Sequence, residues 1–422
     1  MAESRSSIFY GWYVLAATSL ILFISSGARL TIGVMMKPVI AEFGWSRSAV
    51  SLAVFSNMVV FAVSVIIVGK LYDRYGPKWV ILVSSLLFSA GYMLMAVMTS
   101  FWQFFFLYGF LSAAGTGGTT LSIFAAVMSK WFEKRRGLAI SLGLSGGCIG
   151  QFAIVPLFTH MVLAYGWRLS NLFIGLVSLV VNVVLVLVVI KGDPDDLGVE
   201  PYGRATVNHR ESTGHHPPEA SGVRDLGLGE AMRTRSLWLF AFFMFVCGSG
   251  DFLVSTHLIA LVTDHGISAT TGGNMLAWFG LLSLGGILAA GPASDLIGNR
   301  IPIALTFALR VVLFLLILKY QGMLPFYFFS LGFGFSFLVT APLSATLAGR
   351  LYGFSHVGAM VGFVHTVHHV GGGLWAYMGG VIFDRTGSYD LAFAISAIMA
   401  LMAVVCTLLI KETRHLPRES LL

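Results

Sequence analysis

Ionisable side chains are rare inside the long apolar stretches of this chain, and those that occur there are the first candidates for chemistry. A charged side chain at the centre of a bilayer costs about 2.5–3.5 kcal/mol on insertion scales, so a charge kept there usually faces a cavity or a partner. Arg29 and Asp251 are two such residues, related by a shift of 222 positions. They could form a structural ion pair, or Arg29 could bind an anion with Asp251 as its proton or gating partner, or the two could pack independently. Arg310 could contact a bound molecule, bond to carbonyls or extend towards the interface.

Three histidines form a second candidate group. His365, His368 and His369 are spaced by three and four residues, so one face of a helix presents His365 beside both others. Imidazole titrates near neutral pH, so this group could relay protons or bind an anion, and hydrogen-bonded packing is the alternative. No Cys or carboxylate lies near them in the sequence. We therefore predict no metal site and no cofactor.

Uncharged polar residues form a third group. Small hydroxyl residues bridge helices in membranes, and packing is the default interpretation of the stripe around Thr116. Further polar or aromatic wall residues are expected at Asn57, Asn274 and Trp278.

The elements that carry these residues are predicted to be membrane helices. Hydrophobic residues make up 57% of the 422 positions and charged residues only 11%, against about 25% charged in soluble domains. Apolar runs of about 20 residues are long enough to cross a bilayer as helices. Twelve runs are expected, at about 11–36, 48–69, 79–99, 102–128, 138–163, 169–190, 237–262, 271–292, 302–320, 324–348, 357–381 and 389–410. The fold class is thus an all-α membrane protein with twelve transmembrane helices.

The distribution of Lys and Arg predicts the orientation, because cytoplasmic loops retain these residues. With both termini cytoplasmic, the inner segments hold 19 of the 26 Lys and Arg residues and the outer segments five. We expect a multi-pass protein of the cytoplasmic (inner) membrane that acts as a monomer. The net charge of +7 then reflects anchoring at the bilayer, and no nucleic-acid motif accompanies it.

Polar composition divides the chain into three parts. Residues 191–235 have the Pro, Gly, Ser and charge content of a cytoplasmic linker. The predicted domains are therefore an N-terminal six-helix bundle (1–190), the linker (191–235) and a C-terminal six-helix bundle (236–422).

An internal repeat relates the two bundles. At the shift of 222 residues, one loop signature falls on another. The paired positions are Gly69 with Gly291, Asp73 with Asp295, Gly76 with Gly298 and Lys78 with Arg300. The sequences GKLYDRYGPK and GPASDLIGNR resemble the signature G-x-x-x-D-[RK]-x-G-[RK]-[RK] of the major facilitator superfamily. Leu296 replaces the basic residue that the first copy carries as Arg74.

The resemblance implies two pseudo-symmetric six-helix bundles that transport by alternating access, with the two loops latching the cytoplasmic side. Arg29 and Asp251 would then lie on equivalent, cavity-lining helices and face each other, and such a pair could form part of an outer gate. Segments such as YGWYVLAA, FGWSRSAVS and GDPDDLG resemble bacterial monocarboxylate and oxalate/formate-type members. Those members often carry a substrate-binding arginine four residues before the second signature glycine, where this chain has Ile287.

We therefore expect a secondary transporter of a small organic anion, a mono- or dicarboxylate, with or without a proton. No G-x-x-x-x-G-K-[ST] motif is present, so a gradient would drive it. A drug or cation efflux antiporter is the alternative, with Asp251 as its acid, although SGGCIGQFAIVP lacks the G-P-x-x-G-G pattern of such proteins. A non-transporting sensor would need a larger cytoplasmic domain. No catalytic constellation indicates an enzyme.

Overall fold

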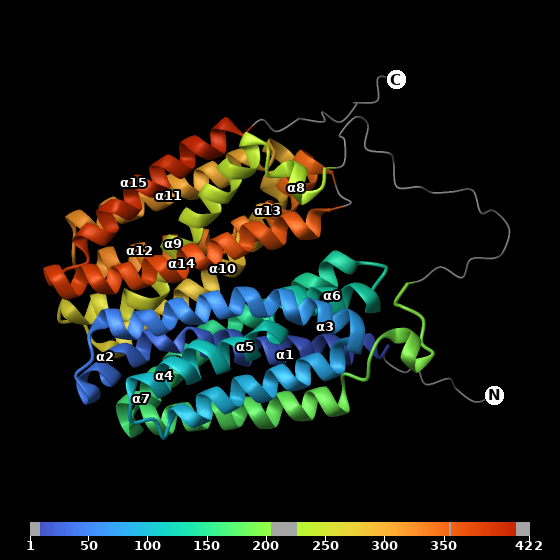
Figure 1. Cartoon of the computed structure of the whole chain (residues 1–422), viewed down its shortest axis with the longest axis horizontal. Helices are drawn as coiled ribbons and strands as arrows, with labels where there is room; N and C mark the ends of the chain where they lie inside the picture. Colours follow the sequence, from blue (N-terminus) through green and yellow to red (C-terminus); the bar gives the residue numbers. More distant parts are fainter. Residues whose placement is uncertain (1–8, 204–225, 354–355, 411–422) are drawn as a thin grey trace. The chain divides into compact units, whose positions relative to one another are not determined.

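The computed structural model describes residues 9–203, 226–353 and 356–410, and nearly all of them are helical (Figure 1). The middle of the predicted linker and the ends of the chain, with several of the Lys and Arg residues counted for orientation, lie outside these ranges.

The N-terminal half contains six predicted passes. The first pass is split into α1 (Gly11–Arg29) and α2 (Thr31–Phe43), and α3 (Arg47–Met95) contains the second and third. The fourth pass is irregular. It consists of α4 (Phe101–Phe106), a π-helix η1 (Leu107–Ser112), α5 (Ala113–Thr116), a 3-10 turn η2 (Gly117–Thr119) and α6 (Leu121–Trp131). The fifth and sixth form α7 (Arg136–Val188).

The C-terminal half follows two short elements, η3 (Pro194–Leu197) and α8 (Leu228–Ala231). Its passes are α9 (Arg235–Asp264), α10 (Ala269–Ile297), α11 (Arg300–Lys319), α12 (Met323–Phe337) with α13 (Thr340–Tyr352), α14 (Val357–Thr386) and α15 (Asp390–Leu409).

The prediction of twelve passes is confirmed. Nine helical segments in the described part of the chain are long and apolar enough to cross a membrane. Two of them, α3 and α7, are double passes that turn at Gly76 and Gly166, where φ is 74° and 81°. The 30-residue α14 supplies the remaining pass.

Backbone geometry confirms the internal repeat. Gly76 and its equivalent Gly298 both have left-handed φ values, 74° and 80°. Gly44 and Gly266, also 222 residues apart, have φ of 69° and 76°. A residue with a β-carbon rarely adopts this conformation, so glycine is required where each repeat turns from one helix into the next.

Contacts divide the described residues into two units. The first contains residues 9–203 together with Ser255–Gly280, and the second contains 226–254 and 281–410. The division into units runs through α9 and α10, and the domain bounds predicted from the sequence (1–190, 191–235 and 236–422) stay a prediction. Close packing explains where the units divide. A β-carbon on Gly33 of α2 would lie 2.8 Å from the Ser255 carbonyl oxygen, so this part of α9 packs directly on the first pass.

Glycines in α1 and α7 bring these two helices into close contact. A β-carbon on Gly27 would lie 2.6 Å from the carbonyl oxygen of Gly150, and one on Gly150 would overlap the carbonyl oxygen of Phe23. The two backbones thus touch with no side chain between them, which is how small residues hold helices together in lipid.

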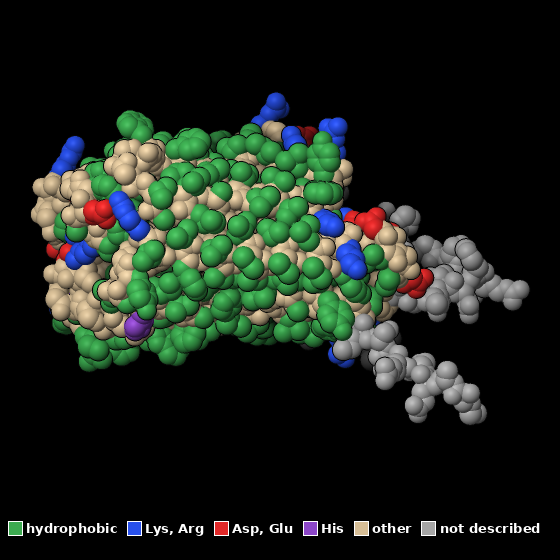
Figure 2. All heavy atoms as spheres, turned by 90° about the horizontal axis from the view of Figure 1, so that it is seen from below, with side chains coloured by type: hydrophobic (Ala, Val, Ile, Leu, Met, Phe, Trp, Pro, Cys, Tyr) green, Lys and Arg blue, Asp and Glu red, His purple; other side chains and the backbone are tan. Residues whose placement is uncertain are grey.

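The outer surface fits a hydrocarbon solvent. On the face drawn in Figure 2, hydrophobic side chains cover the middle and charged side chains gather at the two ends. Large apolar residues such as Ile67, Val180 and Leu187 are about half exposed. Such exposure is expected of helices that face lipid.

Candidate functional sites

A break in the first pass positions Arg29. Helix α1 ends at Arg29 and α2 begins at Thr31, and the hydroxyls of Thr31 and Tyr92 both donate to the Ala28 carbonyl, at 2.7 and 2.8 Å. These bonds satisfy a carbonyl that the break removes from the regular helical ladder. The equivalent pass, α9, is continuous from Arg235 to Asp264. The two repeats therefore differ at the position of Arg29.

Arg29 is partly exposed and has no carboxylate partner among the described residues of its unit. Its guanidinium carbon lies 4.4 Å from the centroid of the Phe61 ring, a cation–π contact that leaves the N–H donors available. Next to it, the broken backbone begins a new helix at Thr31, whose N-terminus carries a partial positive charge. The surroundings of Arg29 favour an anion.

Asp251, by contrast, is fully engaged within the second unit. Arg310 of α11 places Nη2 2.7 Å from Asp251 Oδ1, and both side chains are almost completely buried. The sequence had offered Arg29 as the partner of Asp251. The structure assigns Arg310 instead, because a continuous α9 directs Asp251 towards α11 within its own unit.

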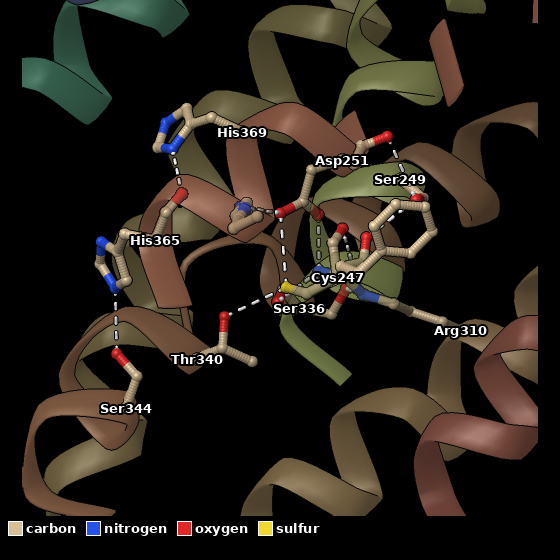
Figure 3. Close-up of polar contacts among 12 residues, drawn as sticks. Cys247, Ser249, Asp251, Arg310, Ser336, Thr340, Ser344, His365 and His369 are labelled. Carbon is tan, nitrogen blue, oxygen red and sulfur yellow. Dashed lines mark hydrogen bonds and ion pairs between the residues drawn. The ribbon is translucent and has the colours of Figure 1, made fainter. Parts of the chain in front are cut away.

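Every nitrogen of Arg310 has a partner. Nε donates to Ser336 Oγ at 3.1 Å, Nη2 to the Ser336 carbonyl at 3.1 Å and Nη1 to the Cys247 carbonyl at 3.0 Å. The guanidinium also lies over the Phe333 ring. Figure 3 shows the Arg310 side chain together with Cys247, Asp251 and Ser336. Among the open interpretations of Arg310, bonding to neighbouring carbonyls is therefore the one that the contacts support.

His368 of α14 reaches the other oxygen of the same carboxylate. Its Nε2 lies 3.4 Å from Asp251 Oδ2, and its Nδ1 is buried without a hydrogen-bond partner in the structure. Because Gly248 carries no side chain, α9 can approach the backbone carbonyl of His368 closely, which brings the imidazole to Asp251. Asp251 is thus held between a permanent cation and a titratable base.

The other two histidines are oriented by the helix and its neighbour. His369 Nδ1 donates to the His365 carbonyl at 2.7 Å, and His365 Nε2 lies 3.1 Å from Ser344 Oγ. The rings of His368 and His369 are stacked, with centroids 5.1 Å apart. The three histidines lie on one stretch of α14, and His368 lies beside the Asp251 carboxylate.

Donor atoms of Cys247, Asp251 and His368 lie within 4.8 Å of one another. No cysteine or carboxylate lies near these histidines in the sequence, but the fold brings Cys247 and Asp251 of α9 close to His368. Cys247 Sγ lies 3.6 Å from Asp251 Oδ2 and 3.2 Å from Thr340 Oγ1. The guanidinium on Asp251 opposes a divalent cation, so these residues do not fit a metal site well.

Asn57, a predicted wall residue, and Thr116, for which packing was the default interpretation, both have structural partners. The π-helix η1 leaves the Tyr108 carbonyl free for the Asn57 side chain, whose Nδ2 donates to it at 2.6 Å. The Thr116 hydroxyl donates to the Ser112 carbonyl at 2.8 Å, and Thr116 is buried. Asn57 and Thr116 therefore stabilise the irregular fourth pass.

Asn274 and Trp278, one turn apart on α10, differ from this pattern. Asn274 is partly exposed, and no hydrogen bond joins its side chain to another described residue. Trp278 is 41% exposed and makes an edge contact with Phe152 at 5.2 Å between centroids. Both remain available to a ligand.

Comparison with known proteins assigns the family. The model of the Major Facilitator Superfamily matches residues 18–260 and again residues 239–421. The chain belongs to the major facilitator superfamily.

Relatives within the superfamily are distant but align over the whole chain. An uncharacterized MFS-type transporter, YcxA of Bacillus subtilis (strain 168), is 25% identical, with 97% of this chain and 99% of that protein covered. Monocarboxylate transporter 13 of Rattus norvegicus is 24% identical, with 92% of this chain and 86% of that protein covered.

Solved structures show the same superfamily fold. A bacterial homologue of the human lysosomal transporter Spinster, in an inward-facing and occupied conformation, has a TM-score of 0.71 at 15% identity, covering 96% of this chain and 97% of that one. The nucleoside transporter NupG has a TM-score of 0.74 at 12% identity, covering 96% and 100%.

The superfamily signature loops adopt equivalent turns, but their latch role stays a prediction. Asp73 and Asp295 are exposed, and no ion pair joins either to another residue in the described ranges. A β-carbon on Gly69 or Gly291 would meet nothing within 4 Å. Arg300 donates to the carbonyls of Leu408 and Ile410, at the end of α15.

Sequence reasoning missed one cluster in the first unit. Arg47 donates to both carboxylate oxygens of Asp264, at 2.7 and 2.9 Å, and Lys37 lies 2.7 Å from Oδ1 of the same carboxylate. In the sequence analysis, Lys37 and Arg47 were only two of the five Lys and Arg residues of the predicted outer segments. The signal that could have found them is an acid at the end of the seventh predicted helix, opposite two cations that flank the first outer loop.

Proposed function

We propose that the chain is a secondary active transporter for a small organic anion, a mono- or dicarboxylate, with Arg29 as the group that binds its carboxylate. The observation that supports this is the partly exposed Arg29 guanidinium beside a break in the first pass, without a carboxylate partner among the described residues of its unit. An arginine in a membrane segment is retained when a partner compensates it. Arg310 has such partners, and Arg29 lacks a carboxylate among the described residues of its unit.

Proton symport provides the driving force in this proposal. The pair of Asp251 and His368 is the proton site, because the imidazole lies 3.4 Å from a carboxylate whose other oxygen is held by Arg310. Binding of a proton to Asp251 or His368 changes the charge of this site. Arg310 cannot make this change, because its guanidinium stays charged. Monocarboxylate transporters among the relatives favour the substrate class.

The protein resides in the cytoplasmic membrane with both termini inside, as the Lys and Arg distribution predicts. It acts there as a monomer. Asn274 and Trp278 line the substrate path from α10.

Drug or cation efflux receives less support from the site. That function needs an acid free to meet a cationic substrate, and the one proposed, Asp251, is ion-paired with Arg310 and buried. The anion proposal is therefore preferred.

A ligand-stabilisation screen followed by transport assays tests the proposal. Purified protein is heated with mono-, di- and aromatic carboxylates, and a true substrate raises the melting temperature by an amount that grows with the logarithm of its concentration relative to its Kd. Arg29→Ala should weaken binding of that carboxylate by at least about 30-fold, since losing a charge-assisted partner costs about 2–5 kcal/mol. Arg29→Lys should retain part of the affinity. Undiminished uptake by Arg29→Ala proteoliposomes would refute the assignment.

Proton coupling is tested separately. His368→Gln should abolish accumulation driven by an inward proton gradient while leaving exchange of labelled for unlabelled substrate intact. His365→Gln is the matched control, because His365 contacts Ser344 and not the carboxylate. If His368→Gln accumulates substrate normally under the gradient, this pair is not the proton site.

A further inference from the structure

An apolar groove opens on the first unit between the two arms of α3. Its volume is about 470 Å³. One wall runs from Val60 to Leu71, the other from Tyr75 to Leu87, and Ala114 forms part of the floor. The two arms diverge from the turn at Gly76, so the groove begins at the signature loop and extends into the membrane region.

Small residues leave the groove unfilled. Ser64 donates to the Ala114 carbonyl at 2.8 Å, which ties the second pass to the fourth. A β-carbon on Gly117 would overlap Ser64 Oγ, and one on Gly118 would overlap Ser84 Oγ. The helix backbone therefore lies directly under both arms, and no large side chain rises into the space between them.

The walls are apolar and face outward. Val63, Ile67 and Val83 are each about half exposed, and Trp79 at the loop end is 59% exposed. Trp and Tyr are typical of the membrane interface, where an apolar ring meets the head-group region. In a bilayer, a groove of this kind is occupied by an acyl chain, because water has no polar groups to bind there.

Three cations stand at the loop end of the groove. Lys70, Arg74 and Lys78 directly precede the groove residues Leu71, Tyr75 and Trp79 in the sequence. The Arg74 guanidinium carbon lies 5.2 Å from the centroid of the Tyr75 ring, which places this charge at the groove. Within the described ranges, no ion pair neutralises the three cations, and only Asp73 opposes them along this loop.

We propose that this groove is a binding site for an anionic phospholipid. One acyl chain lies between the arms of α3, and the phosphate group lies at Lys70, Arg74 and Lys78. Charge complementarity selects the lipid, since each Lys or Arg near an anionic membrane surface strengthens binding about fivefold. The inference is independent of the transported substrate, and it gives the basic residues of the first signature loop a ligand.

A second groove provides an internal comparison. It has a volume of about 500 Å³, lies between α9 and α15, and carries a single cation, Arg235. Its size and apolar lining resemble those of the α3 groove, so it should accept acyl chains with little preference for an anionic head group.

Native mass spectrometry of the purified full chain tests the site. The protein is titrated with phosphatidylglycerol and phosphatidylcholine of identical acyl chains, with inorganic phosphate as a third ligand. We expect phosphatidylglycerol to bind at least about tenfold more tightly than phosphatidylcholine. The triple variant Lys70→Gln, Arg74→Gln, Lys78→Gln should lose this preference. Ile67→Trp, which fills the groove, should release the bound lipid.

The controls separate this site from general lipid adhesion. Arg235→Gln and Val405→Trp alter the second groove and should leave the phosphatidylglycerol preference unchanged. Equal binding of the two lipids, or a preference that survives both the triple variant and Ile67→Trp, would overturn the proposal. Displacement of the lipid by inorganic phosphate alone would also overturn the proposal, because the lipid's acyl chain would then contribute nothing to its binding. If the triple variant fails to fold, Lys78→Gln with Ile67→Trp decides the question.

Discussion

Glu42 and Asp264 occupy equivalent positions in the two repeats, 222 residues apart, yet they bind different partners. Glu42 accepts from Trp167 Nε1 at 2.7 Å and lies 2.8 Å from Arg168 Nη2, so it ties the first pass to the turn between the fifth and sixth. Asp264 is held by Arg47 and Lys37. Glu42 therefore holds the first pass to the turn between the fifth and sixth, and Asp264 joins the end of α9 to α2 and to the start of α3.

Removing the Asp264 carboxylate should loosen this outer contact. The side chains of Arg47, Asp264 and Lys37 are 11%, 25% and 36% exposed, so solvent screens the cluster and its contribution is about 1 kcal/mol. Asp264→Asn should then raise the labelling rate of a cysteine placed at the buried Ser255 about fivefold, measured with a membrane-impermeant thiol reagent. The experiment uses a background without the three native cysteines.

Glu42→Gln is the control for this prediction, because its partners do not involve α9. The exchanged pair Arg47→Asp with Asp264→Arg should restore slow labelling. An unchanged labelling rate in Asp264→Asn would show that the cluster does not hold the end of α9 against α2 and α3.

The buried pair of Asp251 and Arg310 should respond differently to single and double substitution. Removing one partner leaves a buried charge uncompensated, which typically destabilises by about 3–5 kcal/mol. Arg310→Met alone should therefore lower the melting temperature in detergent sharply. The double variant Asp251→Leu, Arg310→Met should recover most of the loss, since apolar residues of similar size often replace a buried pair without penalty.

Lys319→Met provides a matched control, because Lys319 ends the same helix and is exposed. The melting temperature of this variant should stay within the error of the parent. Equal destabilisation by the single and double variants would mean that the two residues are not energetically coupled.

The fold could be predicted from the sequence because it depends on patterns that are visible in a single amino-acid sequence. Twelve apolar runs, the repeat and the glycines of α7 are all local features, and hydrophobic length alone separates a spanning helix from a loop. The units defined by contact could not be predicted this way. They depend on where Gly33 of the first pass meets Ser255 of the seventh, which is a contact between distant segments.

The candidate site was predicted by residue type but not by partner. Arg29, Asp251, Arg310 and the histidines were identified because charges are rare in apolar runs. The pairing of Asp251 with Arg310 was missed because the repeat relates Asp251 to Arg29, and symmetry of position was taken as proximity. The break after Arg29 also left no trace in the sequence, since neither glycine nor proline occupies position 30.

Two asparagines of the predicted wall should behave differently. Asn57 is buried and donates to the Tyr108 carbonyl at 2.6 Å, whereas Asn274 is partly exposed without a hydrogen bond to the described residues. Asn57→Leu should destabilise the protein by about 1–3 kcal/mol, because the buried Tyr108 carbonyl loses one of its two side-chain donors and keeps only the Ser112 hydroxyl. Asn274→Leu should leave the melting temperature unchanged and weaken ligand binding. Equal effects of both variants on stability would contradict this division.

The crossing of α1 and α7 should be the least tolerant point of the first unit. A β-carbon on Gly150 would overlap the Phe23 carbonyl oxygen and lie 2.6 Å from its Cα, and both are backbone atoms that cannot rotate away. Gly150→Ala should therefore force the helices apart and destabilise the protein by about 1–3 kcal/mol, the usual effect of overpacking. Gly69→Ala is the matched control, because a β-carbon there meets nothing within 4 Å and alanine is favoured over glycine within a helix by about 1 kcal/mol. Thermal unfolding of both variants in the same detergent should show a lower midpoint for Gly150→Ala and an equal or higher one for Gly69→Ala. The reverse order would mean that α1 and α7 do not touch through their backbones.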